Sequence, residues 1–331
     1  MSMSNSLNKK FHLAGNIFDS PDQVPARNGY GEGVVQAGYA DENVVVLCCD
    51  LTESTRNAKF KETFPERFIE IGIAEQNMAG IAAGMAFSGK IPYISSYATF
   101  NPGRNWDQIR ISICYSMANV KIMGAHAGIS VGPDGATHQA MEDIAITRCL
   151  PILKVIVPCD YWETKKAAIA IAGIESPVYM RFGREKIPVI TTEKTPFQIG
   201  RADTYRDGQD VTVIACGSLV YEALVAAEKL SGDGIDLRVI NCHTVKPIDE
   251  KSIIKAAKET GAIVTAEEHQ VHGGLGNAVA EVVAKNSPVP MEYVAMMDRF
   301  GESGEPNELM HKFGLDSKGI IKAVKKVLRR K

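Results

Sequence analysis

The chain alternates between short apolar runs and longer amphipathic stretches, and this alternation constrains its fold more than any other feature. In the first half, we expect helices at Asn28–Tyr39, Glu75–Ser88, Trp106–Met117, His138–Leu150 and Tyr161–Ile174. The strands expected there are Val44–Cys49, Phe68–Ile73, Pro92–Ser96, Val120–Gly124, Leu153–Pro158 and Val178–Arg181. Apolar runs separated by such helices predict a mostly parallel sheet with helices on both faces.

The second half repeats the alternation after Gly183–Asp210, a stretch rich in Pro, Thr, Gly and charge that predicts a linker or a hairpin. Helices are expected at Tyr221–Leu230, Glu250–Thr260, Leu275–Ala284 and Gly319–Arg330. Strands are expected at Val211–Ala215, Leu237–Asn241, Ala262–Ala266 and Glu292–Ala295. We therefore predict an α/β protein with two doubly wound domains, 1–190 and 210–331, joined by a linker at 191–209.

Composition excludes several classes of protein. The 331 residues are 45% hydrophobic and 23% charged, the mixture typical of globular domains. A formal net charge of −2 argues against a nucleic-acid partner. The N-terminus has no apolar run, so neither a signal peptide nor a membrane anchor is expected. Seven cysteines without a CxxC pair predict reduced core thiols and a cytoplasmic protein.

Polar and aromatic residues follow the first-domain strands. The carboxyl ends of parallel strands meet at one edge of a sheet, where ligands bind. We therefore expect one site there, containing Asp50, Ser54, Glu75, Tyr97, Phe100, Arg104, His126, Asp134, His138 and Arg181.

Each of these residues also has a purely structural interpretation. Glu75 begins a helix and could serve only its first turn. Tyr97 and Phe100 could be core aromatics, and His126 could be a histidine whose hydrogen bonds are all made beneath a loop. Arg181 could pair with a carboxylate. Their expected co-location favours a functional site over these separate explanations.

Three stretches carry a resemblance to a known family: GIAEQNMAGIAAGMA from Gly72, YATFNPGRNWDQIR from Tyr97, and AHAGISVGPDGATHQAMEDIA from Ala125. They resemble the pyrimidine-binding domain of transketolases, and residues 210–331 resemble the family's C-terminal domain. The implied fold is a thiamine-diphosphate-enzyme pyrimidine domain followed by a transketolase C-terminal domain. The family's N-terminal diphosphate-binding domain has no counterpart in this sequence, so the chain is similar to the C-terminal subunit of a split transketolase.

The resemblance implies a role for individual residues. Glu75 matches the glutamate that hydrogen-bonds the aminopyrimidine of thiamine diphosphate, and the other cofactor-binding matches are Asp50, Tyr97 and Phe100. Sugar-binding matches are His126, Asp134 and His138, of which the two histidines join Glu75 as catalytic residues. Matches for the substrate phosphate are Arg27, Ser54 and Arg181, and two arginines favour a phosphorylated sugar. The NPGR run departs from the family pattern by one residue and leaves Arg104 without a role.

The activity implied is transfer of a two-carbon ketol group from a ketose phosphate to an aldose phosphate, as in the pentose phosphate pathway of carbohydrate metabolism. An N-terminal partner subunit would hold the diphosphate and magnesium, so the lone chain is not expected to bind the cofactor tightly. A homodimer is expected at the core of a heterotetramer. The sequence does not identify the sugars.

Three alternatives stay open: the beta subunit of a 2-oxo acid dehydrogenase, a deoxyxylulose-phosphate-synthase-like enzyme, and a non-catalytic relative. Intact Glu75, His126 and His138 argue against the last. A second group of titratable residues lies in the C-terminal half, and its spacing fits no standard metal site. We expect a structural or interface role for its members, which are His243, Glu267, Glu268, His269 and His272.

Overall fold

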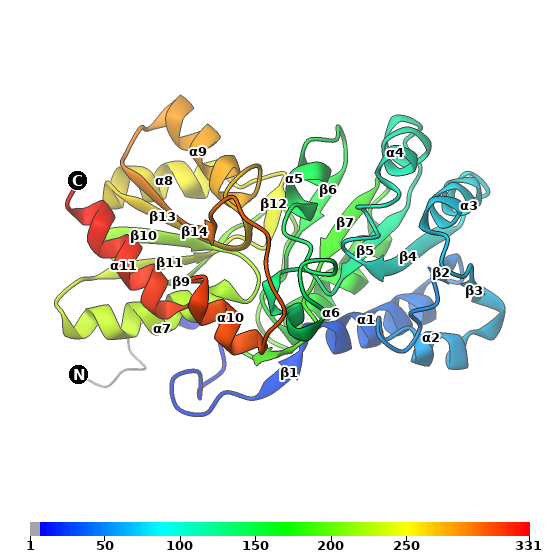
Figure 1. Ribbon diagram of the computed structural model, residues 1–331, viewed down its shortest axis with the longest axis horizontal. Coiled ribbons are helices and arrows are strands. Elements are labelled where there is room, and N and C mark those ends of the chain that lie inside the picture. Colours follow the sequence, from blue (N-terminus) through cyan, green and yellow to red (C-terminus); the bar gives the residue numbers. More distant parts are fainter. Residues whose placement is uncertain (1–6) are drawn as a thin grey trace.

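The computed structural model describes residues 7–331, which form two α/β lobes lying side by side (Figure 1). The first lobe contains a seven-stranded sheet of order β12-β6-β7-β5-β4-β2-β3. All neighbouring strands in it are parallel except β12, which runs antiparallel to β6. The strands are β2 (Val44–Cys48), β3 (Phe68–Glu70), β4 (Ile91–Tyr97), β5 (Lys121–Ala125), β6 (Lys154–Ile156), β7 (Val178–Arg181) and β12 (Thr244–Lys246).

Helices cover both faces of this sheet because successive strand residues point to opposite sides. Val44 and Val46 of β2 pack in the cluster that contains α1 and α6, whereas Val45 and Leu47 pack in the cluster that contains α3. The helical segments are α1 (Ala26–Ala40), α2 (Ala58–Thr63), α3 (Glu75–Phe87), α4 (Trp106–Gln108), the π-helical η4 (Ile109–Tyr115), α5 (Asp143–Arg148) and α6 (Tyr161–Ala170).

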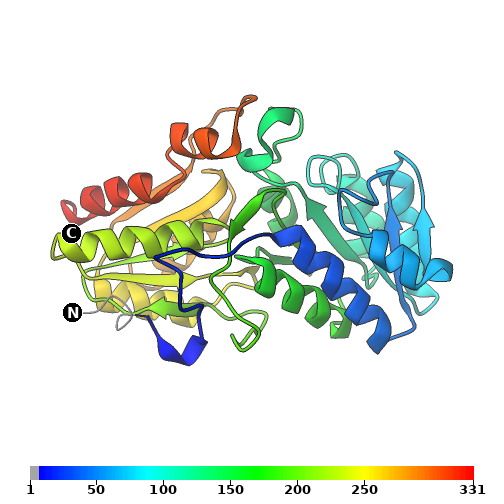
Figure 2. The same cartoon turned by 90° about the horizontal axis from the view of Figure 1, so that it is seen from below.

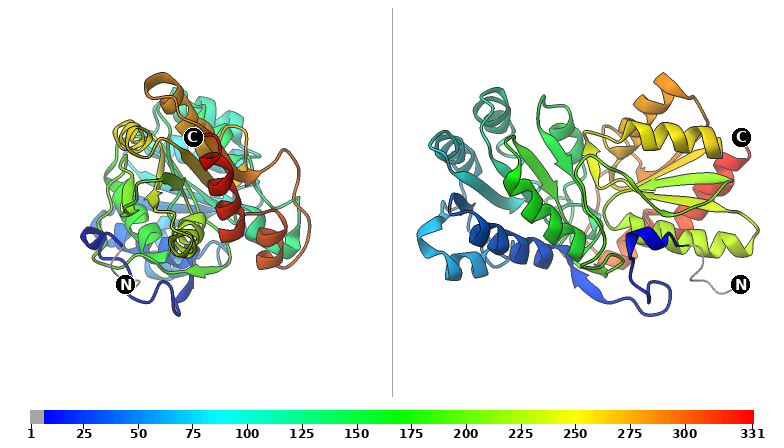
Figure 3. Two further views of the ribbon diagram at one scale, coloured as in Figure 1. Left: turned by 90° about the vertical axis from the view of Figure 1, so that its left-hand side faces the viewer. Right: turned by 180° about the vertical axis from the view of Figure 1, so that it is seen from behind.

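The second lobe contains a five-stranded sheet of order β14-β13-β10-β11-β9, in which only β9 is antiparallel. Helices α7 and α11 pack in a different core cluster from α8 and α9, which lie across the sheet (Figure 3). The elements are β9 (Asp203–Arg206), β10 (Val211–Ala215), β11 (Leu237–Asn241), β13 (Ile263–Gln270), β14 (Met291–Met296), α7 (Leu219–Gly232), α8 (Glu250–Thr260), α9 (Leu275–Asn286), α10 (Pro306–Lys312) and α11 (Ser317–Leu328).

The predicted two doubly wound α/β units are confirmed, but the boundary between them is less simple than the sequence indicates. Part of the segment expected as a linker at 191–209 is built into the second sheet as β9. Strand β8 (Lys186–Pro188) pairs with β1 (Gln23–Pro25). The N-terminal segment packs along the second lobe before the chain enters α1 in the first (Figure 2).

One predicted helix is mostly absent. The stretch 138–150 is helical only over α5, because side-chain bonds stabilise a loop in its first part. Gln139 is buried and its amide donates to the carbonyls of Ile129 (3.2 Å) and Glu302 (2.9 Å). The loop therefore closes on itself and on the second lobe.

The cysteines are reduced, as their number and spacing predict. All seven cysteines are free, and six are buried; Cys149 is exposed. In residues 7–331, no helix has the length and apolar character needed to cross a membrane.

Candidate active site

Two aromatic rings and two imidazoles lie together at the carboxyl edge of the first sheet. Tyr97 ends β4 and His126 follows β5, and their rings stack at 4.0 Å between centroids with 25° between planes. Phe100 lies 6.1 Å from Tyr97. His138 meets Tyr97 and Phe100 edge-on, at 6.2 and 5.5 Å. The loops after two adjacent strands thus bring four of the predicted site residues into one cluster.

His126 is held in an unusual conformation and a neutral state. Its backbone φ of 54° lies in the left-handed region, where non-glycine residues concentrate at functional sites. The side chain is 2% exposed. Burial, together with the positive charges of Arg27, Arg184 and Arg56, lowers the pKa of His126 to about 3. Because the imidazole is neutral, one ring nitrogen can donate a hydrogen bond and the other can accept one.

Glu75 is the first residue of α3, yet its carboxylate faces the site. The side chain is 1% exposed. Its Oε1 accepts a hydrogen bond from Ser96 Oγ (3.1 Å), and its Oε2 accepts from Arg104 Nη1 (2.7 Å). The start of α3 has no side-chain cap. The interpretation of Glu75 as a simple capping residue is therefore not supported.

Arg104 connects the carboxylate to the aromatic cluster. Its guanidinium carbon lies 4.4 Å from the centroid of the Phe100 ring, within cation–π range, while Nη1 pairs with Glu75. The Arg104 side chain is 44% exposed. The residue for which the sequence offered no role is thus the link between Glu75 and Phe100.

Three arginines line one end of a cavity of about 960 Å³ between the lobes. Arg27 Nη1 donates to the carbonyl of Ser54 (3.0 Å). Arg184 Nη1 donates to the carbonyl of Val131 (3.2 Å) and lies 3.6 Å from Asp134 Oδ2. The third is Arg56. Two predicted phosphate-site residues, Arg27 and Ser54, are thus in contact.

Arg181 does not lie in the place expected for it, and its contacts do not support its assignment to the substrate phosphate. The side chain is only 5% exposed. Its Nε pairs with Asp143 (2.8 Å), and its Nη2 donates to the carbonyls of Glu268 (2.6 Å) and Ala140 (3.3 Å). These bonds fix Arg181 in the junction between the lobes. The arginine that lines the cavity lies three residues later, at Arg184.

Asp50 lies outside the aromatic cluster. It follows β2 with a left-handed φ of 56° and is exposed. Its backbone N–H donates to Glu70 Oε1 (2.7 Å). The Asp50 carboxylate forms no hydrogen bond or ion pair in residues 7–331, and its expected role in cofactor binding stays a prediction.

The titratable group in the C-terminal half makes structural contacts. The Glu267 carboxylate accepts from the N–H groups of Leu275 (2.7 Å) and Gly276 (2.8 Å), at the start of α9. Glu268 accepts from the N–H of Ser130 (2.7 Å), in the loop that precedes Asp134. Among residues 7–331, no group of three or more His, Cys, Asp or Glu side chains is arranged to hold a metal ion.

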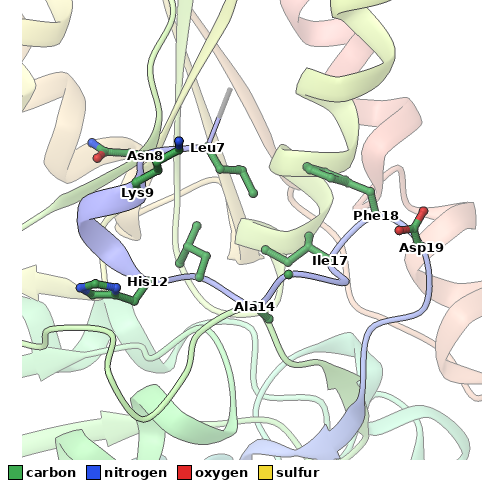
Figure 4. A pocket seen from close by; sticks show the side chains of 10 residues that line it. Leu7, Asn8, Lys9, His12, Ala14, Ile17, Phe18 and Asp19 are labelled. Atoms are coloured by element: carbon green, nitrogen blue, oxygen red, sulfur yellow. The ribbon is translucent and has the colours of Figure 1, made fainter. Parts of the chain in front are cut away.

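A separate hollow lies beneath the N-terminal segment. Its volume is about 300 Å³, and Leu7–Asp19 supplies its lining (Figure 4). None of the expected site residues belongs to this segment. The chemistry therefore concentrates at the sheet edge and the inter-lobe cavity.

The comparisons with known proteins agree with this geometry. Residues 22–189 match the domain described as "Transketolase, pyrimidine binding domain", and residues 200–320 match "Transketolase, C-terminal domain". The fold is thus that of a pyrimidine-binding domain followed by a transketolase C-terminal domain.

Similar proteins extend over almost the whole chain. "Putative transketolase C-terminal section" of Methanocaldococcus jannaschii is 45% identical over 92% of this chain and 96% of its own. "6-deoxy-6-sulfo-D-fructose transketolase subunit SqwH" of a Clostridium species is 41% identical over 92% and 95%. A solved structure described as "Split gene transketolase, inactive beta4 tetramer" superposes with a TM-score of 0.86 at 42% identity, over 93% of this chain and 99% of that one. The chain belongs to the transketolase family and corresponds to the C-terminal section of its split members.

Proposed function

We propose that this chain, with a partner subunit, catalyses thiamine-diphosphate-dependent transfer of a two-carbon ketol group between sugar phosphates. The observation that carries the proposal is the linked arrangement of Glu75, Phe100 and the two imidazoles at one sheet edge. A 2-oxo acid dehydrogenase does not need the His126–Asp134–His138 set, because its donor lacks the row of hydroxyl groups that a sugar presents. Family membership supports a transferase.

The residues present fit the aminopyrimidine part of thiamine diphosphate. An ionised carboxylate offers about four lone-pair positions, and Glu75 uses two of them within the chain. It can therefore accept a further hydrogen bond from a protonated ring nitrogen. Phe100 is half-buried and supplies an aromatic surface beside it. When bound, the cofactor supplies the electron sink that allows a ketose carbon–carbon bond to break.

The sugar would be held by the imidazoles and Asp134. Neutral His126 can accept from one hydroxyl and donate to another oxygen, and its Nδ1 is buried without a partner in residues 7–331. His138 Nδ1 is 2.9 Å from Thr137 Oγ1, which orients the ring toward Tyr97 and Phe100. Asp134 is exposed and accepts only. Together these groups can fix hydroxyls near the reacting carbons.

The phosphate of the sugar is assigned to Arg27 and Arg184, with Ser54 beside Arg27. This assignment replaces Arg181, whose donors are used inside the protein. Guanidinium groups suit phosphate because their planar fork binds two oxygens at once.

A partner chain would supply the grip on the diphosphate and magnesium. This chain offers no metal-binding cluster in residues 7–331, and the similar solved assembly of four beta chains is described as inactive. We further propose that two copies pair through α3, whose outer face presents apolar and glycine residues. These are Gly80, Ile81, Gly84 and Phe87, and the exposed Ile73 lies just before the helix.

The proposal is tested by activity of the chain alone and together with a chain that carries a transketolase diphosphate-binding domain. Xylulose 5-phosphate with an aldose phosphate should give ketol transfer only in the mixture, and pyruvate should not be decarboxylated. Turnover of pyruvate in place of the ketose would contradict the proposal and favour the oxo-acid alternative. Tight binding of thiamine diphosphate by the lone chain, measured by calorimetry, would contradict the partner's role.

A further inference from the structure

Arg56 is fixed in the inter-lobe cavity by contacts at both its backbone and its side chain. Its backbone φ of 65° lies in the left-handed region. Its carbonyl packs so closely against α1 that a Cβ at Gly31 would lie 2.6 Å from the oxygen. Its Nε donates to Asn28 Oδ1 (2.9 Å). With Nε engaged, the two terminal nitrogens form no hydrogen bond in residues 7–331, and Arg56 lines the cavity together with Arg27 and Arg184.

The three arginines differ in how their charge is balanced. Arg184 lies near two carboxylates, Asp134 at 3.6 Å and Glu185 at 3.3 Å. In residues 7–331, no carboxylate lies within ion-pair distance of Arg27 or Arg56. Burial lowers the pKa of Arg27, and repulsion from Arg56 and Arg184 lowers it further. Arg27 and Arg56 are therefore the two guanidinium groups of this cavity that lack a carboxylate partner in residues 7–331.

Acidic residues also line the cavity, but two of them already serve the start of α11. The Glu222 carboxylate accepts from the N–H of Ser317 (2.7 Å), and Asp316 accepts from the N–H of Gly319 (2.9 Å). Both belong to the second lobe, whereas the arginines belong to the first. Glu222 and Asp316 are thus committed to a helix, and Glu305, the third carboxylate that the second lobe contributes to the cavity, forms no ion pair with the three arginines in residues 7–331.

We propose that Arg56 is a specificity-determining residue that gives the substrate site a preference for a dianionic end group. The inference rests on the proposed function for the identity of the ligand as a sugar phosphate. Two unbalanced guanidiniums match the two charges of a phosphate, whereas a sulfonate carries one. Removing Arg56 therefore weakens phosphate binding more than sulfonate binding.

The binding test uses the full chain and two simple probes at pH 8, inorganic phosphate and methanesulfonate, titrated by calorimetry. Arg56→Gln should weaken phosphate binding about tenfold or more, the usual effect of losing a charged hydrogen bond, and methanesulfonate binding by less than about twofold. Arg56→Lys, which keeps the charge, should lie between the two. Arg201→Gln removes the same charge on the exposed inter-lobe segment and should change neither affinity.

Two results would overturn the inference. Equal weakening of both anions by Arg56→Gln would show no preference for a dianion. Equal effects of Arg56→Gln and Arg201→Gln would show only a change in net charge. A melting temperature of each variant within a few degrees of the parent establishes that the fold is kept.

A kinetic arm separates this inference from the proposed function. In the assembled enzyme, Arg56→Gln should raise KM for a ketose phosphate about tenfold and leave KM for the unphosphorylated ketose unchanged. If the assembly transfers no ketol group at all, the proposed function fails, while the phosphate titration still decides the role of Arg56. Unchanged phosphate affinity in Arg56→Gln overturns the inference whatever the activity.

Discussion

Glu75 and Arg104 are the residues on which the proposed chemistry depends most directly. A buried carboxylate is costly unless it is paired and hydrogen-bonded. Glu75 has both kinds of partner, in Arg104 and Ser96. These two partners stabilise an ionised Glu75 carboxylate at the carboxyl edge of the sheet.

We predict that Glu75→Gln lowers kcat of the assembled enzyme by about 100-fold or more, the usual scale for a group that controls proton transfer. Glutamine keeps the shape but removes the charge that a protonated ring nitrogen requires. Steady-state kinetics measures the loss, and Glu70→Gln is the matched control on the preceding strand. Near-normal turnover in Glu75→Gln would remove this residue from the mechanism.

We predict that Arg104→Ala lowers the free energy of unfolding by about 1–3 kcal/mol at pH 7, because it leaves the Glu75 carboxylate buried without its cation. In the Glu75→Gln background, Arg104→Ala should lower the free energy of unfolding by less, because no buried charge is then left without a partner. Urea unfolding of the four proteins gives the coupling energy directly. Strictly additive losses would show that the two side chains do not stabilise each other.

The sequence predicted which residues gather at the edge but not which arginine faces the cavity. Strand ends meet in any parallel sheet, so the co-location of Tyr97, His126 and Glu75 followed from their positions alone. Arg181 is the last residue of β7 and Arg184 lies three residues further on. The direction of Arg181 is set by Asp143 and by the carbonyl of Glu268 in the other lobe, contacts that sequence spacing does not reveal.

At the scale of elements, the backbones of α1 and α6 come into direct contact where glycines of α1 face α6. A Cβ at Gly29 would overlap the carbonyl oxygen of Tyr161, and one at Gly33 would lie 2.6 Å from the carbonyl of Lys165. Only a residue without a side chain permits this approach. Arg27, at the start of α1, is positioned by the same contact.

We predict that Gly29→Ala destabilises the protein by about 1–3 kcal/mol, since the methyl group must push α1 away from α6. Chemical denaturation measures the change. Gly232→Ala is the control, because this glycine at the end of α7 has open space around it. A loss of similar size in both variants would assign the effect to glycine chemistry and not to the helix contact.

Helix α3 presents a face that one copy leaves uncovered. Ile81→Asp should raise the dissociation constant of a pair of copies by at least about tenfold, because it buries a charge in the proposed contact. Light scattering after gel filtration measures the shift. Met297→Asp, at an exposed position in the second lobe, should leave assembly unchanged. Unaltered assembly in Ile81→Asp would exclude this face.

Elements with a clear apolar or amphipathic pattern were predictable, whereas strands without such a pattern were not. The bounds expected for β10, β11 and α8 agree with the structure. Strands β9 and β12 are only four and three residues long and are defined by the strands they pair with, β11 and β6. The stretch after His138 has helical composition, yet the bonds of Gln139 hold its first part as a loop.

At the scale of the whole molecule, the lobes share a buried polar network. Glu163 of α6 accepts from Asn241 Nδ2 (2.7 Å) at the end of β11, and Tyr205 of β9 lies within 3.4 Å. Burial, and to a lesser extent the charge of Asp160, raises the pKa of Glu163 to about 8. The folded protein therefore holds a proton that the unfolded chain releases near pH 4.5.

We predict that this stabilising contribution is present below about pH 4.5 and is lost as the pH rises through about 8. Glu163→Gln should remove that dependence, so the melting temperature of the parent should fall relative to the variant between pH 5.5 and pH 8.5. The difference between the two proteins cancels the opposite effects of His126 and His243, whose pKa values are lowered by burial. Parallel melting curves across this range would contradict the raised pKa.

Strand β12 leaves the second half of the chain to complete the first sheet, beside β6. We therefore expect that proteolytic cleavage between β7 and β9 breaks the chain while the pairing of β12 with β6 still holds the two halves together. The sheet of the first domain is therefore incomplete without a strand from the C-terminal half of the chain.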